Sequence, residues 1–103
     1  MPSPVVEFNV SRCAELYPCV IDGAGNFVTG PRGWSLNKPA VGVYEVFHHF
    51  GDMQYMPMVS NADTATMKAS CSVSSRDTDK VVVFCYDGGV AADISFMLLV
   101  YRL

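Results

Sequence analysis

The sequence has almost no helix signal and few charged residues. No stretch sustains apolar residues at the i, i+3, i+4 and i+7 spacing of a helix packed on a core. Only 17% of the 103 residues are charged, whereas typical soluble chains carry about 25%. This shortage of charge predicts that part of the protein surface is hidden in an assembly.

Other absences exclude whole classes of partner. The net charge is −3 and no cluster of Lys and Arg occurs, which argues against binding to a nucleic-acid backbone. No apolar run approaches the roughly 20 residues of a membrane-spanning helix, so we expect no membrane insertion. The opening residues MPSPVVEFNV lack the basic and apolar regions of a signal peptide, which predicts a protein made and used from the cytoplasm.

The residues that could carry chemistry are poorly placed for it. The four cysteines lack the paired spacing of a structural zinc site, and without a signal peptide we expect free buried thiols: Cys13, Cys19, Cys71 and Cys85. His48 and His49 are adjacent, so a regular strand would point them to opposite faces, where they cannot share one metal ion. Most carboxylates fall in predicted turns. The sequence therefore predicts no catalytic residue, no metal site and no cofactor.

Short apolar runs separated by turn residues are typical of an all-β sandwich or barrel. We expect a compact antiparallel β-sandwich, jelly-roll-like, formed by one domain over residues 11–103 and preceded by an N-terminal arm over residues 1–10. Pro57 predicts an edge or a bulge for its strand. The sandwich should contain about eight strands, at residues 17–21, 27–30, 34–38, 41–50, 54–60, 65–73, 80–86 and 93–103.

Two of these strands carry apolar side chains on both faces. Side chains alternate along a strand, yet both faces of residues 80–86 and 93–103 are apolar, and residues 42–50 carry apolar or aromatic side chains on both faces, with His48 on one and Glu45 and His49 on the other. Because a small domain cannot easily cover both sides of its sheets, we expect a symmetric oligomer. The residues assigned to its interface are Tyr44, Val46, Phe84, Tyr86, Phe96, Leu98 and Val100.

Methionines and aromatic residues give two further expectations. Met fills irregular gaps, so the cluster of Met53, Met56, Met58 and Met67 is assigned to the core. Tyr17, Trp34 and Tyr55 are candidates for contacts with a ligand, because exposed aromatic rings stack on sugar rings.

The second half of the chain resembles small β domains at the C-terminal tips of bacteriophage tail fibres and in other phage virion proteins. The resemblance lies in GVYEVFHHF, DKVVVFCYDGG and AADISFMLLVYRL, with GWSLNKPAVGVYEV as the lead-in. It implies an all-β sandwich, usually a homotrimer, without catalysis or cofactor, in a virion assembled in the host cytoplasm. The implied partners are other copies of the chain, other virion proteins and a host surface glycan.

Residues 1–103 contain no shaft-like or coiled-stem pattern, which is a departure from the tail-fibre pattern. A capsid decoration (cement) protein is the alternative within the same family, and its arm, Met1 to Val10, would lie across a neighbouring subunit. Two alternatives come from other classes: a monomeric carbohydrate-binding module, and a small hydrolase that uses His48 or a carboxylate pair.

Overall fold

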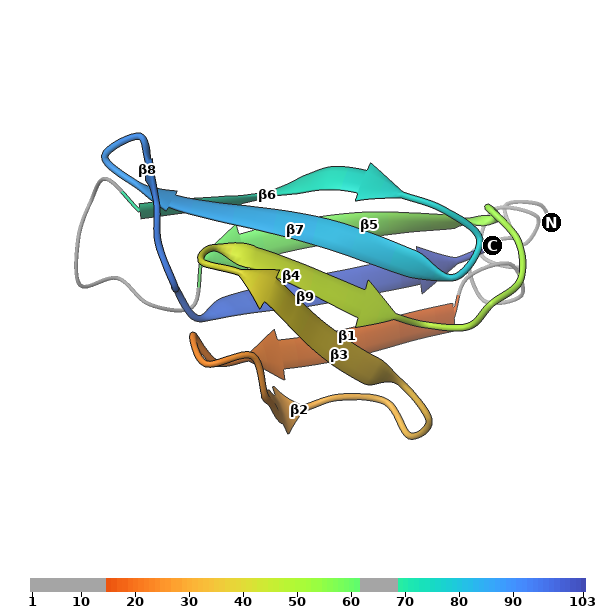
Figure 1. The fold of residues 1–103 in the computed structure, drawn as a ribbon. Helices are drawn as coiled ribbons and strands as arrows, with labels where there is room; N and C mark the ends of the chain where they lie inside the picture. The colour runs from red at the N-terminus through yellow and green to blue at the C-terminus, as the bar shows by residue number, and fades with distance from the viewer. Residues whose placement is uncertain (1–14, 62–68) are drawn as a thin grey trace, which may run out of the picture.

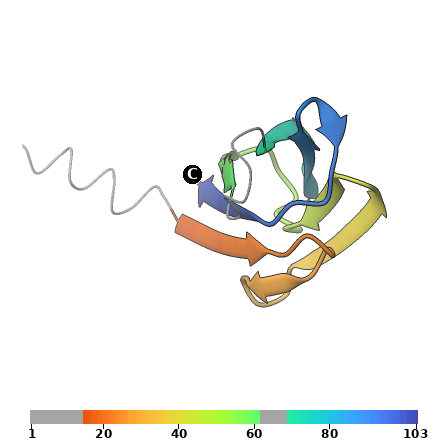
Figure 2. The same ribbon diagram turned by 90° about the vertical axis from the view of Figure 1, so that its left-hand side faces the viewer.

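The computed structural model describes residues 15–61 and 69–103, which form two antiparallel sheets packed face to face (Figure 1). The end view in Figure 2 shows the strands of both sheets surrounding a common interior. Within the described residues there are nine strands: β1 (Glu15–Ile21), β2 (Phe27–Thr29), β3 (Ser35–Ala40), β4 (Val43–Phe47), β5 (Tyr55–Asn61), β6 (Ala69–Arg76), β7 (Lys80–Asp87), β8 (Val90–Ala91) and β9 (Phe96–Arg102).

Sheet A has the strand order β2-β1-β9-β5, and sheet B has the order β3-β4-β7-β6 with the short β8 beside the end of β7. In the centre of sheet A, β9 pairs with β1 and β5 along seven residues each. In sheet B, β7 pairs with β4 and β6. The two most apolar strands of the sequence are therefore central strands, since a central strand gains pairing on both sides.

The core lies between the sheets and is built by alternate residues of the central strands. Tyr44 and Phe96 meet there edge to face, with ring centroids 5.0 Å apart. Burying each Leu- or Phe-sized side chain contributes about 1.5–3 kcal/mol, so this layer is the main source of stability. Its members are Cys19, Ile21, Tyr44, Val46, Tyr55, Val81, Val83, Cys85, Ile94, Phe96, Leu98 and Val100.

Gly42 shows why the β3–β4 hairpin needs a glycine. Its φ is +71°, and a side chain there would meet the backbone oxygen of Cys85 at 2.5 Å. The Gly42 N–H donates to Oδ1 of Asp93 at 2.8 Å, and Lys38 forms an ion pair with the same oxygen. This turn fixes the start of β4 so that Tyr44, two residues later, points into the core and donates its O–H to the Gly23 carbonyl.

Three strands carry a proline where they have a side without a pairing partner. Pro57 lies in β5, an edge strand of sheet A, which confirms the predicted edge position. Pro39 lies in β3, an edge strand of sheet B. Pro18 lies in the part of β1 that β2 does not pair, because β2 reaches only Val20 and Ile21. Since proline lacks the N–H that a further strand would need, these edges resist strand addition.

The all-β sandwich is confirmed, while several strand boundaries differ from the prediction. The strand predicted at residues 41–50 spans only Val43–Phe47, so His48 and His49 lie beyond β4. Strand β8 was not predicted, since two residues carry no readable alternation. The predicted arm, residues 1–10, and the first residues of the predicted strand 65–73 lie outside the described residues.

The expectation of free thiols is wrong for two of the cysteines, because Cys71 and Cys85 form a disulfide between β6 and β7. They are directly opposite in the register of these strands. Cys19 is a free and buried thiol, as expected, and burial raises its pKa to about 12. Cys13 lies outside the described residues.

Candidate assembly surface

Five of the seven residues assigned to an oligomer interface lie inside the single chain. Tyr44, Val46, Phe96, Leu98 and Val100 are at most 1% exposed and pack between the two sheets, so the chain itself covers them. The structure thereby corrects their assignment to a surface. The other two, Phe84 and Tyr86, are half-buried on the outer face of sheet B, with ring centroids 6.4 Å apart.

The outer face of sheet A, by contrast, is both exposed and free of charge. Its side chains alternate with the buried ones of β1, β9 and β5, so they point away from the core. The strand register places them in three rows of three. We call this surface the apolar face: Leu16, Tyr101 and Met56 in the first row, Pro18, Leu99 and Met58 in the second, and Val20, Met97 and Ser60 in the third.

Large side chains of the apolar face stand in contact with solvent. Leu16 is 57% exposed and Met56 58%, while Met58 and Met97 are 46% and 45% exposed. Single exposed apolar residues need no explanation, but a contiguous group without charge marks an interaction surface.

The expectation that the methionines fill the core is wrong for Met53, Met56 and Met58, which are exposed, and Met67 lies outside the described residues.

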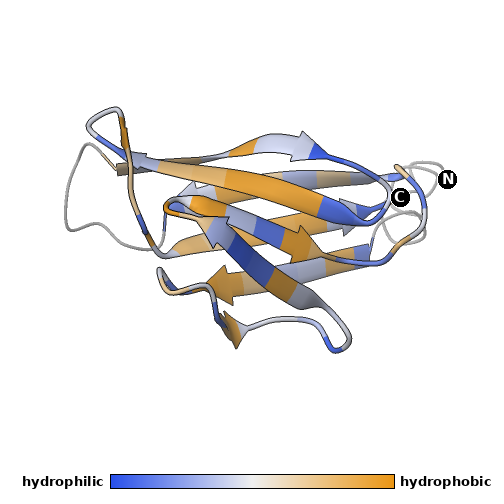
Figure 3. Cartoon of the chain, viewed as in Figure 1, coloured by the Kyte–Doolittle hydropathy of each residue, from blue (hydrophilic) through white to orange (hydrophobic). Residues whose placement is uncertain are grey.

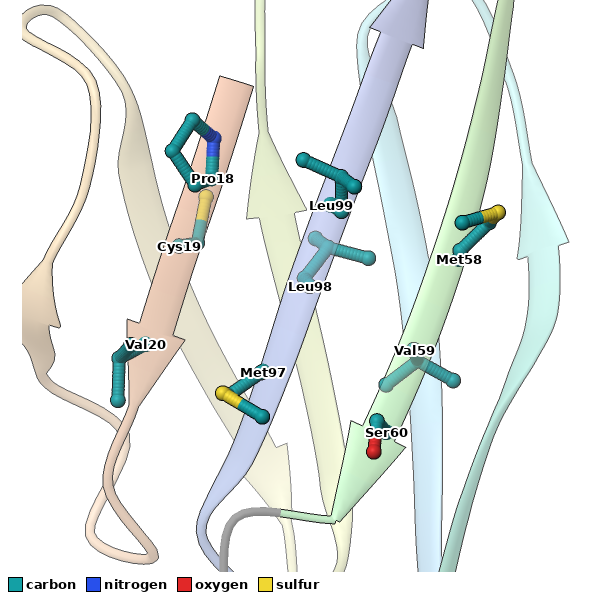
Figure 4. Close-up of a pocket in the computed structure, with 9 residues that line it drawn as sticks. All are labelled: Pro18, Cys19, Val20, Met58, Val59, Ser60, Met97, Leu98 and Leu99. Carbon is teal, nitrogen blue, oxygen red and sulfur yellow. The ribbon is translucent and has the colours of Figure 1, made fainter. Parts of the chain in front are cut away.

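A hollow of about 420 Å³ opens on the apolar face between its second and third rows. Figure 4 shows its walls, which come from β1, β9 and β5, three neighbouring strands of sheet A. Ser60 is the one polar residue among those that line it: Pro18, Cys19, Val20, Met58, Val59, Ser60, Met97, Leu98 and Leu99. A hollow with this lining favours an apolar side chain over any charged or strongly polar ligand.

The outer face of sheet B is closed by polar contacts instead. Lys80 forms an ion pair with Glu45 at 2.9 Å, and Asn37 donates to the same carboxylate at 2.8 Å. The hydrogen bond from Lys80 and that from Asn37 lower the pKa of Glu45. The Lys80 ammonium also lies over the Phe47 ring, 5.5 Å from its centroid. Figure 3 shows that β3, at the margin of this sheet, is hydrophilic, whereas β7 is hydrophobic over most of its length.

The aromatic residues proposed to contact a ligand lie in one cluster at the end of the sandwich. Tyr17 stacks on Trp34 at 5.5 Å, and both rings contact Phe50. Tyr55 is 3% exposed and belongs to the core, so its ring is not available to a ligand. Tyr17 also lines a second, shallower hollow of about 290 Å³ with Leu16, Pro18, Thr29, Gly30 and Pro31.

His48 completes this cluster as a buried imidazole between two rings. Its centroid is 4.3 Å from that of Phe50 and 4.4 Å from that of Tyr55. Two guanidinium groups lie over these rings, Arg102 over Phe50 at 4.5 Å and Arg76 over Tyr55 at 5.2 Å.

The hydrogen bonding of His48 favours the neutral form. Nδ1 accepts the backbone N–H of Phe50 at 3.0 Å, whereas Nε2 has no hydrogen-bond partner among the described residues. Burial, the largest cause, lowers the pKa of His48, and the carboxylates of Asp79 and Asp77 oppose this only in part. The imidazole is therefore a structural member of the cluster in its neutral state.

The two histidines lie in different surroundings, although neither is in the regular strand on which the prediction of opposite faces rested. His49 is exposed at a φ of +60° and its Nδ1 lies 2.9 Å from Oδ1 of Asp79. In residues 15–61 and 69–103, no group of three or more His, Cys, Asp or Glu side chains is arranged to hold a metal ion. The described residues also contain no helix with the length and apolarity needed to cross a membrane.

No family model, curated protein or solved structure matches the chain. The resemblance to phage virion domains therefore stays a prediction from the sequence. The functional surface must be inferred from the geometry above.

Proposed function

We propose that this chain is a non-enzymatic structural protein of a bacteriophage particle, of the tail-fibre or receptor-binding type, and that it works as a homo-oligomer, a trimer in the pattern that its strand motifs resemble. The observation that carries the proposal is the apolar face, which joins nine side chains without a single charge. Leaving such a surface in water forfeits burial free energy and invites aggregation. Contact with neighbouring copies, or with other virion proteins, would cover it.

The strand edges support assembly through a sheet face. Pro18, Pro39 and Pro57 stand where an incoming strand would pair, and proline there is a common protection against open-ended stacking of sheets. A closed oligomer held by the face satisfies both features. Capsid decoration is the alternative role within the same class, since a cement protein also assembles through such contacts.

The test is the mass of the unmodified protein in solution, measured by light scattering at micromolar concentration, together with labelling of purified particles in electron micrographs. We expect a discrete oligomer and label on the virion. A stable monomer with clean behaviour, absent from particles, would overturn the proposal. Label on the head rather than the tail would assign the decoration role.

Carbohydrate binding by a monomer is a second candidate, and the hollow beside Tyr17 favours it. Binding to a glycan array by a monomeric protein, lost in Tyr17→Ala, would support this candidate. We expect the oligomer instead, because Trp34 and Tyr17 already stack on one another and on Phe50.

A further inference from the structure

The hollow on the apolar face needs an occupant that comes from above the sheet. The proline positions close the neighbouring edges to a further strand, so an added segment must lie on the face. The walls are apolar and uncharged, so the occupant must present apolar side chains on one side only and polar groups to water on the other.

A segment separated from β1 by four residues has this pattern. In residues 5–10, VVEFNV, the residues Val6, Phe8 and Val10 alternate with Glu7 and Asn9. Side chains two residues apart in an extended chain are about 6.6–6.8 Å apart. The rows of the apolar face have the same spacing, because they too are two residues apart along each strand. Alternate side chains of such a segment would therefore fit between the rows.

We propose that residues 5–10 of a neighbouring copy lie extended on the apolar face, with Phe8 in the hollow. Val6 and Val10 would cover the rows on either side, and Glu7 and Asn9 would face water. Phe8 is the one ring in the segment, and the hollow of about 420 Å³ is large enough for it. This inference rests on the proposed function, because it requires an oligomer.

The exchange accounts for closure of the assembly. Each copy gives one segment and receives one, which is a head-to-tail contact, and such contacts form rings when the rotation closes. A trimer is the ring expected from the resemblance.

Disulfide trapping between two variants of different mass tests the proposal in the full chain. One variant carries Phe8→Cys and the other, with a purification tag, carries Met97→Cys; both carry Cys13→Ser to remove a competing thiol. Met97 is exposed and lines the hollow, so its replacement leaves the core intact. After mixing and mild oxidation, we expect a tagged–untagged disulfide between residues 8 and 97.

Each other result overturns the proposal. A third variant carries both Phe8→Cys and Met97→Cys in one chain. If this variant forms the disulfide within its own chain, and the mixture of the two single variants forms no link, the segment covers the face of its own chain. A link between two residues 97 would show that two faces meet directly. No link at all would leave the hollow with another occupant. The mass of the unmodified protein is measured in parallel: an oligomer without the 8–97 link sinks this inference alone, whereas a monomer also sinks the proposed function.

A second measurement uses matched serine variants. Phe8→Ser should weaken association about 10- to 100-fold, the loss expected for one buried ring. Val5→Ser, on the opposite side of the segment, should weaken it less than about threefold. Equal effects of the two substitutions, or none, would contradict the assignment of Phe8 to the hollow.

Discussion

The two outer faces of the sandwich differ in how they meet water. On sheet B, Glu45, Lys80 and Asn37 form hydrogen bonds over the aromatic side chains. On sheet A, Leu16, Met56, Met58 and Met97 are exposed beside one another, and no ionic group lies among them. Within the described residues, none of the large exposed apolar side chains belongs to β3, β4, β6 or β7.

The difference teaches that composition alone does not identify an interaction surface. Strand β7 of sheet B is as apolar as β9 of sheet A, yet its outward Val82, Phe84 and Tyr86 are all half-buried, whereas Met97 on the outward side of β9 is 45% exposed. We infer that sheet B stabilises the single chain and that sheet A serves assembly. Substitutions on the two faces should therefore affect different measurements.

The largest effect is expected from charges on the apolar face. Met58→Lys with Met97→Lys places two cations on the walls of the hollow, and we expect association at least about 100-fold weaker, since the loss of burial is compounded by desolvation of charge. Light scattering over a concentration series measures this. Val90→Lys is the control, because Val90 is 69% exposed on β8, away from sheet A; if it dissociates the oligomer equally, the apolar face has no special role.

The second effect concerns sheet B and should spare assembly. Cys71→Ala with Cys85→Ala removes a disulfide that closes a short loop, with a sequence separation of 14 residues. The free energy of unfolding should fall by about 3 kcal/mol, measured by denaturant unfolding at one protein concentration. The folded variant should form an oligomer of the same size as the unmodified protein does. A loss of oligomer without loss of stability would reverse the roles that we assign to the two sheets.

A smaller effect, also on the single chain, comes from the end cluster. The pKa of His48 is lowered in the folded state by burial, so below its ordinary value of 6.5 the unfolded chain binds more protons than the folded one. Stability should therefore fall as the pH falls from about 7 through the region below 6.5. Denaturant unfolding at several pH values measures the slope.

A matched pair of substitutions isolates this histidine. His48→Asn keeps an acceptor for the Phe50 N–H. In this variant the free energy of unfolding should change little with pH above the range in which carboxylates titrate. His49→Asn, at an exposed position next to it, should leave the slope of the unmodified protein. The assignment fails if the His48 variant retains the full slope.

The sequence allowed the fold class to be predicted, because alternation and turn residues mark strands locally. It did not allow the inward face to be chosen. In β9, Phe96, Leu98 and Val100 oppose Met97 and Leu99, and both sets are apolar. Only the pairing with β1 and β5 decides which set enters the core. For the same reason five residues assigned to an interface proved to be core, and exposed methionines were assigned to the core.

The spacing of Cys71 and Cys85 could have predicted the disulfide, but we expected free thiols because the sequence has no signal peptide. Cys71 and Cys85 are placed evenly about residue 78, which lies between the predicted strands 65–73 and 80–86, so an antiparallel register brings them opposite. The hollow had no such signal, because it is formed by β1, β9 and β5, strands far apart in the sequence. Contacts within a hairpin can be read from spacing, whereas a site shared by distant strands requires the topology.

The smallest effect should come from the ion pair on sheet B. The side chains of Lys80 and Glu45 are 30% and 20% exposed, and pairs with this much access to solvent contribute about 0–1 kcal/mol. Glu45→Gln should therefore lower the free energy of unfolding by less than about 1 kcal/mol, and added salt should narrow the difference from the unmodified chain.

The contribution of this pair to stability should be lost as the pH falls, because the group that titrates is a carboxylate. Hydrogen bonds from Lys80 and Asn37 lower the pKa of Glu45 below its usual 4.5, so its contribution is present above that value and is lost as the pH falls through the lowered pKa. Asn37→Ala, which removes one of the two donors, should move this loss towards higher pH, as measured by unfolding between about pH 5 and 3. Because we assign assembly to sheet A and not to sheet B, neither substitution should change the mass of the oligomer. Dissociation caused by Glu45→Gln would show that sheet B also carries an interface, and the contrast between the two faces would then be lost.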